Sequence, residues 1–195
     1  MPAGVNNVRS AGAGFAAGLA AFLIGYLVTF LWRGREIERS IEPLEALFSL
    51  FEAEPIGAWR VVGWLYYGGH FVDTRVTAEF GPFETAVYLD LVREGAGTLE
   101  TLYLVPPVLL LVAGAIVAAG LRAPDIPTGA MVGASVVVGY LVAILAGLVV
   151  FAYGGTRPDP VPAIVIAGLV YPVVFGAVGG VLGRVITDSM RAERR

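Results

Sequence analysis

The stretch GAGFAAGLAAFLIGYLVTFLW, residues 12–32, is 21 residues long and contains no charged side chain. About 20 apolar residues cross a bilayer as a helix, so this stretch predicts a transmembrane helix. Three further uncharged stretches, at 101–121, 128–153 and 161–183, predict three more. The stretch at residues 12–32 is too long to be the apolar part of a secretion signal. It ends in Trp32 followed by Arg33, where a signal peptide would have a small-residue cleavage site. We therefore expect a retained anchor.

The composition agrees with a multi-span membrane protein. Of the 195 residues, 57% are hydrophobic and 15% are charged, and the mean hydropathy is +0.77. Soluble domains average about half apolar and a quarter charged. A net charge of −3 disfavours a nucleic-acid partner, because phosphate binding needs a basic surface. The chain has no cysteine, which excludes disulfides and cysteine-ligated metals.

One connection is much longer than the others. Residues 33–100 form a 68-residue segment with 12 acidic residues and six arginines, for a net charge of −6. We predict an all-α membrane protein, a single membrane domain over residues 1–195, with this acidic segment as an extramembrane insertion between the first two spans. Residues 41–51 predict an amphipathic helix within it. Apolar and polar side chains alternate in residues 75–80 and again in residues 85–92, and Gly81-Pro82 separates the two runs. This pattern predicts a β-hairpin, although the second run also suits a short helix.

An aromatic segment, residues 56–72, lies inside this insertion. Its longest uncharged run has 12 residues, too short to span, and it contains Arg60. We expect a helix lying flat at the membrane interface, away from the termini and over the mouth of the bundle. Arg60 then reaches water while aromatic rings dip inward. The candidate interfacial residues are Trp59, Trp64, Tyr67, His70 and Phe71. The alternative is a fifth span, which would put the termini on opposite sides.

The spans show an internal similarity. Residues 20–32 and 134–146 share six of 13 positions, including the run Gly-Tyr-Leu-Val, and residues 104–114 and 169–179 share five of 11. This pattern is typical of a parallel duplication of two spans plus two spans. Chance similarity among Ala, Val, Leu and Gly is the alternative.

Small residues predict where the helices pack. Without a hydrophobic driving force in lipid, helices associate through close backbone contact at small side chains. The fourth span is the richest in them, with candidate packing residues Gly176, Gly179, Gly180 and Gly183, so we expect it to be the central or dimer-forming helix. Gly180→Leu should therefore disrupt packing, and Leu110→Ala should matter less.

None of the four predicted spans contains Asp, Glu, Arg or His. Proton relays, ion sites and voltage sensors use such groups, so their absence disfavours a pump or a proton-coupled transporter. The candidate solute-lining or hinge residues are Tyr26, Tyr140, Pro107 and Pro172. Pro172 should kink its span and free carbonyl groups near Gly168. The alternatives are two ordinary interface tyrosines and a kink that packing repairs.

The sequence contains no recognisable catalytic or metal-binding motif. His70 is the only histidine, and we expect it to have a structural role near the head groups. No serine follows a nucleophile-elbow pattern, and no histidine–carboxylate spacing fits a metal. We therefore expect no catalytic residue, no cofactor and no metal.

The chain resembles a family of small multi-pass membrane proteins of halophilic archaea that have no established activity and are sometimes loosely labelled as transporters. The residues that carry the likeness are Gly25 to Thr29, Ala58-Trp59-Arg60, Trp64 to Tyr67, His70 to Val72, Gly168 to Pro172 and Phe175 to Gly180. The resemblance implies a prokaryotic cell membrane and adds no mechanism.

These observations predict a non-enzymatic integral membrane protein, a structural or interaction module. The alternative is a small-solute transporter or channel, working as an oligomer. The expected partners are the lipid bilayer and either a second copy or another membrane protein. Six arginines near span ends lie on the side of the termini and five on the opposite side. By the positive-inside rule we predict cytoplasmic termini.

Overall fold

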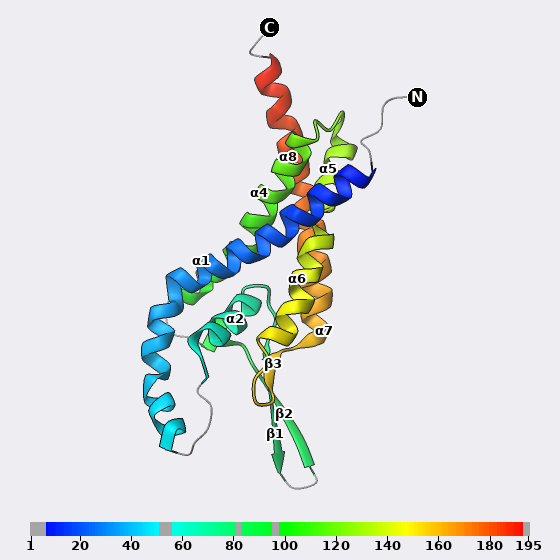
Figure 1. Ribbon diagram of the computed structural model, residues 1–195. Coiled ribbons are helices and arrows are strands. Elements are labelled where there is room, and N and C mark those ends of the chain that lie inside the picture. Colours follow the sequence, from blue (N-terminus) through cyan, green and yellow to red (C-terminus); the bar gives the residue numbers. More distant parts are fainter. Residues whose placement is uncertain (1–6, 51–55, 81–82, 95–97, 193–195) are drawn as a thin grey trace.

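The computed structural model describes residues 7–50, 56–80, 83–94 and 98–192, without side chains at 7–8, 43–50, 78–80, 83–84, 98 and 190–192. The fold is mainly helical. Four helical stretches in it are long and apolar enough to cross a membrane: Arg9–Glu42, Leu99–Gly120, Ile126–Val150 and Pro160–Ser189. Both described ends of the chain lie at one end of the molecule, and a small sheet lies at the other (Figure 1).

The first helix, α1 (Asn7–Leu50), continues well beyond its apolar part. We expected the first span to end at residue 32, yet the helix passes through Arg33, whose guanidinium lies 2.7 Å from the Glu36 carboxylate. That ion pair joins positions three apart on one helical face and supports the continuation. Most of the segment predicted as the amphipathic helix 41–51 is the last part of α1. Its side chains from residue 43 onward, and residue 51, lie outside the described residues. The C-terminal part of α1 bends away from its N-terminal part (Figure 1).

The main helix of the second span and the first helix of the third span have prolines in their first turns. The short 3₁₀ segment η1 (Thr98–Leu104) leads into α4 (Val105–Gly120), with Pro106 and Pro107 in its first turn, where a missing N–H costs nothing. The third span consists of two helices, α5 (Ile126–Ala134) and α6 (Val137–Val150). Asp125 caps α5, because its carboxylate accepts a hydrogen bond of 2.8 Å from the Thr128 N–H.

The fourth span changes its helical pitch along its length. A single turn, α7 (Pro160–Pro162), leads into the π-helical segment η2 (Ala163–Val170), which continues as α8 (Tyr171–Ala192). The Tyr171 N–H donates to the Ile166 carbonyl, five residues back. The π-helical turn ends directly before Pro172, the residue that lacks an N–H. We predicted a kink in the helix at Pro172, and the structure has a π-helical segment immediately before the helix that contains this proline.

A three-stranded sheet extends from the end of the bundle opposite the termini. Strands β1 (Thr74–Phe80) and β2 (Phe83–Leu89) pair antiparallel from Thr74↔Leu89 to Phe80↔Phe83. The short helix α3 (Leu91–Glu94) follows, so the second alternating run contains both a strand and a helix. The third strand, β3 (Thr156–Pro158), pairs with the other edge of β1. It lies in the short connection between the third and fourth spans.

The aromatic segment forms α2 (Ala58–Gly68), an 11-residue helix about half as long as a bilayer-spanning one. It packs into the angle between α1 and α6, and all seven residues from Val62 to Gly68 are buried. The main hydrophobic core joins its side chains to those of α1, α4, α6 and the fourth span. In this way α2 closes the sheet end of the bundle (Figure 1).

Candidate functional site

The most elaborate polar arrangement among the described residues surrounds α2. Three hydrogen bonds to backbone carbonyls join this helix to its neighbours. The Tyr67 hydroxyl donates to the Ile144 carbonyl at 2.6 Å, and the Trp64 indole N–H donates to the Phe151 carbonyl at 2.8 Å. The Tyr26 hydroxyl donates to the Trp59 carbonyl at 3.1 Å. Phe151 caps the C-terminus of α6, so Trp64 satisfies a carbonyl that lacks a helical partner.

Two glycines allow this close approach. A Cβ at Gly25 would collide with the Tyr66 ring, and a Cβ at Gly63 would collide with the Phe151 ring. The absence of a side chain at these two positions lets α2 lie against α1 on one side and α6 on the other.

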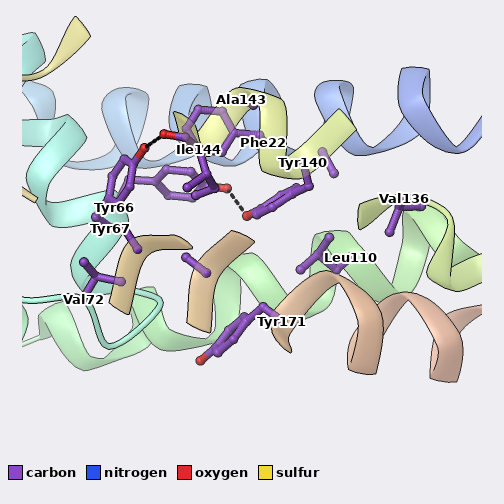
Figure 2. Packing of buried hydrophobic residues seen from close by; sticks show 14 of the residues in the cluster. Phe22, Tyr66, Tyr67, Val72, Leu110, Val136, Tyr140, Ala143, Ile144 and Tyr171 are labelled. Carbon is purple, nitrogen blue, oxygen red and sulfur yellow. Dashed lines mark hydrogen bonds between the residues drawn. The ribbon is translucent and has the colours of Figure 1, made fainter. Parts of the chain in front are cut away.

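A buried histidine and two tyrosines form the centre of the site. His70 Nε2 lies 2.6 Å from the Tyr140 hydroxyl, which lies 2.9 Å from the Tyr66 hydroxyl. His70 Nδ1 lies 2.8 Å from the Tyr66 backbone carbonyl. All three side chains are at most 1% exposed. Figure 2 shows the Tyr66 and Tyr140 hydroxyl groups directed toward each other between α2 and α6.

Hydrogen-bond chemistry sets the direction of every bond in this group. A backbone carbonyl only accepts, so His70 Nδ1 carries the proton, and Nε2 of the neutral ring accepts. Tyr140 therefore donates to His70, and Tyr66 donates to Tyr140. The chain of bonds starts at the Tyr66 side chain and returns to the Tyr66 backbone. All of these donors are satisfied inside the protein.

Burial keeps this histidine neutral. It lowers the pKa of His70 to about 4, and the hydrogen bond to the Tyr66 carbonyl opposes the shift only in part. Burial also raises the pKa of Tyr66. At pH 7 the group carries no charge, which suits a site enclosed by apolar side chains.

The predicted interfacial residues separate into two groups. Trp64, Tyr67 and His70 are buried inside the protein. Trp59 is 37% exposed, and Phe71 is 58% exposed and stacks on Tyr103 with ring centroids 4.4 Å apart. The expectation that Trp64, Tyr67 and Phe71 dip toward the bilayer concerns a membrane, so it stays a prediction. Phe71 has a φ of 59°, which directs the chain out of α2 toward β1.

The structure does not bring the predicted solute-lining residues together in one cavity. Tyr140 is fully buried in the hydrogen-bonded group, whereas Tyr26 lines an outer groove. Pro107 lies in the first turn of α4, and Pro172 follows the π-helical turn in mid-span. The two prolines therefore differ in structural role. Likewise Gly25 packs under Tyr66, whereas Gly139, its counterpart in the proposed repeat, packs against the Phe15 backbone.

The glycines of the fourth span lie at helix contacts. A Cβ at Gly179 or Gly183 would collide with the backbone of α4, at Leu111 or Ala115. A Cβ at Gly180 would collide with the Gly129 carbonyl of α5, and one at Gly176 would lie 2.7 Å from the Gly133 carbonyl. The helix α8 thus lies between α4 and α5 in backbone contact with both. Leu110 is 0% exposed, so Leu110→Ala would leave a cavity. That this change matters less than Gly180→Leu stays a prediction.

Sequence reasoning missed two features of this region. The Arg60 guanidinium lies over the rings of Trp59 and Tyr153, at 4.5 and 5.0 Å from their centroids. The histidine–tyrosine group was missed because its members lie about 70 residues apart along the chain.

These features define a class of protein: a small, mainly helical chain with four helices long and apolar enough to cross a membrane, closed at one end by a short aromatic helix. The chain belongs to the DUF7978 family of unknown function, whose model matches residues 2–187. Searches of curated proteins and of solved structures found no match. The family agrees with the expectation of uncharacterised relatives, whereas an origin in halophilic archaea stays a prediction.

Proposed function

We propose that this chain is a non-enzymatic integral membrane protein, a structural or interaction module that does not conduct solutes. The proposal rests on the closed interior. Where a transport path would need polar groups facing water, Tyr66, Tyr140 and His70 bond to one another and are at most 1% exposed. Between α4 and α8 the backbones touch at Gly114 and Gly176, which leaves no room for a solute.

In this proposal the four apolar helices cross a cell membrane, with the termini in the cytoplasm and the sheet on the opposite side. Most of the acidic segment at 33–100 then lies outside the bilayer. Its described charged residues include Glu36, Glu38 and Glu42 on the extension of α1, and all three are exposed. This extension departs from the bundle (Figure 1), so it offers a partner a separate, charged helical surface.

A flux assay tests the absence of a solute path. The purified protein is reconstituted into liposomes, and osmotic swelling is followed with small neutral solutes such as glycerol and urea. We expect swelling rates equal to those of protein-free liposomes. A glycerol or urea permeability that rises with protein content, and falls in a variant that fills the interior such as Ala113→Leu, would overturn the proposal in favour of a transporter or channel.

A crosslinking experiment tests the partner surface. A photo-crosslinking residue replaces Glu38 on the α1 extension, or the exposed Met131 of α5 as a control on the apolar surface. We expect one discrete protein adduct from position 38 in intact cells and none from position 131. The absence of any adduct from position 38, at normal expression, would remove the interaction part of the proposal.

A further inference from the structure

An apolar groove runs along the outer surface of the bundle between α1 and α6. It has a volume of about 310 Å³ and is lined by Leu19, Phe22, Leu23, Tyr26, Trp59, Ala143, Ala146, Gly147, Val150 and Phe151. Small residues of α6 form its floor, and it ends at three aromatic rings. The Phe151 ring lies 5.3 Å from that of Tyr26 and 6.0 Å from that of Trp59.

The arginine Arg60 lies beside the aromatic end of this groove. The Arg60 guanidinium lies over the rings of Trp59 and Tyr153, and its buried Nε has no hydrogen-bond partner among the described residues. Among the described residues no acidic side chain forms an ion pair with Arg60. An arginine with unused donors at such a place favours a phosphate ligand, since its planar fork matches phosphate oxygens.

Two more arginines lie close to this point. Tyr153 also lines a hollow of about 400 Å³ together with Arg75 and Arg157. Arg75 and Arg157 are register partners on β1 and β3, so their charges lie on the same face of the sheet. Two guanidinium groups on one face of the sheet add positive charge at this end of the groove.

We propose that this groove binds one anionic membrane lipid, with an acyl chain between α1 and α6 and its phosphate head group at Arg60. The inference rests on the proposed membrane location. It is supported by charge complementarity and by the order of the surfaces: an apolar groove along the span, an aromatic collar at its end, and guanidinium groups beyond it. This is the order of acyl chain, interface and head group in a lipid.

Fluorescence of Trp59 tests the site directly, because its ring lines the groove. The chain has three tryptophans, so Trp32→Phe with Trp64→Phe leaves Trp59 as the only one. This variant is reconstituted into vesicles with equal fractions of brominated phosphatidylglycerol or brominated phosphatidylcholine. We expect an apparent preference of roughly fivefold for the anionic lipid in the quenching of Trp59, the effect of about one arginine near an anionic surface.

Three further variants distinguish a site from general attraction. Arg60→Gln should remove the preference, whereas Arg9→Gln, the same charge change near the N-terminus, should keep it. Ala146→Phe, which fills the groove from an exposed position, should also remove it. Equal quenching by both lipids in the parent, or a preference that survives Arg60→Gln, would overturn the lipid site and leave the membrane proposal intact. Absence of quenching by either lipid would overturn both.

Discussion

The Tyr140 hydroxyl lies 2.6 Å from His70 Nε2, across 70 residues of sequence. Through this contact the third span holds the segment that follows α2, and the Tyr66 hydroxyl bonds to the same Tyr140 oxygen. One phenol thus satisfies two buried groups from another part of the chain. This contact joins the predicted insertion to the helices that are apolar enough to span.

Tyr140→Phe should therefore destabilise the protein. The change removes the donor to His70 Nε2 and the acceptor for Tyr66, and a buried polar group left unsatisfied costs about 1–3 kcal/mol. Thermal unfolding in detergent measures the loss. Tyr88→Phe is the matched control, because Tyr88 is 52% exposed on β2. An equal melting temperature for Tyr140→Phe and the parent would contradict the hydrogen-bonded group.

Stability should fall in mild acid because of His70. Its pKa is about 4 in the folded protein and 6.5 in the unfolded chain, so the unfolded chain binds the proton more readily between these values. The contribution is fully present above pH 6.5 and is lost as the pH falls toward 4, by about 3 kcal/mol in all.

Denaturation midpoints at pH 7.5 and pH 4.5 measure this loss, with His70→Asn as the comparison. Carboxyl groups that titrate in the same window contribute equally to both proteins, so the difference between them isolates the histidine. His70→Asn should be the less stable protein at pH 7.5 and should lose less stability on acidification. Parallel pH profiles for the two proteins would mean that His70 is not buried as a neutral ring.

Gly180→Leu should disrupt the bundle. A Cβ at this position already collides with the Gly129 carbonyl, so the larger side chain would separate α8 from α5 at a cost of roughly 3 kcal/mol, the upper range for overpacking. Gly120→Leu is the control, because a Cβ at Gly120 meets nothing within 4 Å. Size-exclusion profiles and melting temperatures in detergent compare the two. If Gly180→Leu elutes and melts like Gly120→Leu, the contact between α8 and α5 is wrong.

The sequence was sufficient to predict the apolar helices, because they depend on local composition. Uncharged runs identify the spans, and four glycines between residues 176 and 183 lie where α8 contacts the backbones of α4 and α5. Uncharged runs could not predict the end of α1, because the helix continues past Trp32 into a charged segment. The ion pair between Arg33 and Glu36 stabilises this continuation.

The candidate site was harder to predict, because it depends on contacts between distant segments. The aromatic residues of 56–72 suggested an interface helix, but their pattern does not distinguish rings that face lipid from rings that face another helix. Only the fold places Tyr66 against Tyr140 and excludes Phe71 from the interior. For the same reason β3 was missed: three residues between prolines and glycines form a strand only because β1 offers an open edge.

Orientation can be measured with cysteine labelling, since the chain contains no natural cysteine. Tyr88→Cys lies at an exposed position of β2, and Ser189→Cys lies at an exposed position near the end of α8. With cytoplasmic termini, a membrane-impermeant maleimide added to intact cells should label residue 88 only, and residue 189 should react after lysis. The reverse pattern would invert the predicted orientation.

The closed interior is the central claim, and thiol reactivity in native membranes tests it most directly. Val117→Cys in α4 and Val136→Cys at the start of α6 place a slightly smaller side chain at positions that are 5% and 0% exposed. Ser189→Cys is the water-exposed reference. A small charged methanethiosulfonate should modify residue 189 within its normal reaction time and leave residues 117 and 136 unmodified until the protein is denatured. Modification of residue 117 or 136 at a rate close to that of residue 189 would show water inside the bundle and would contradict the account.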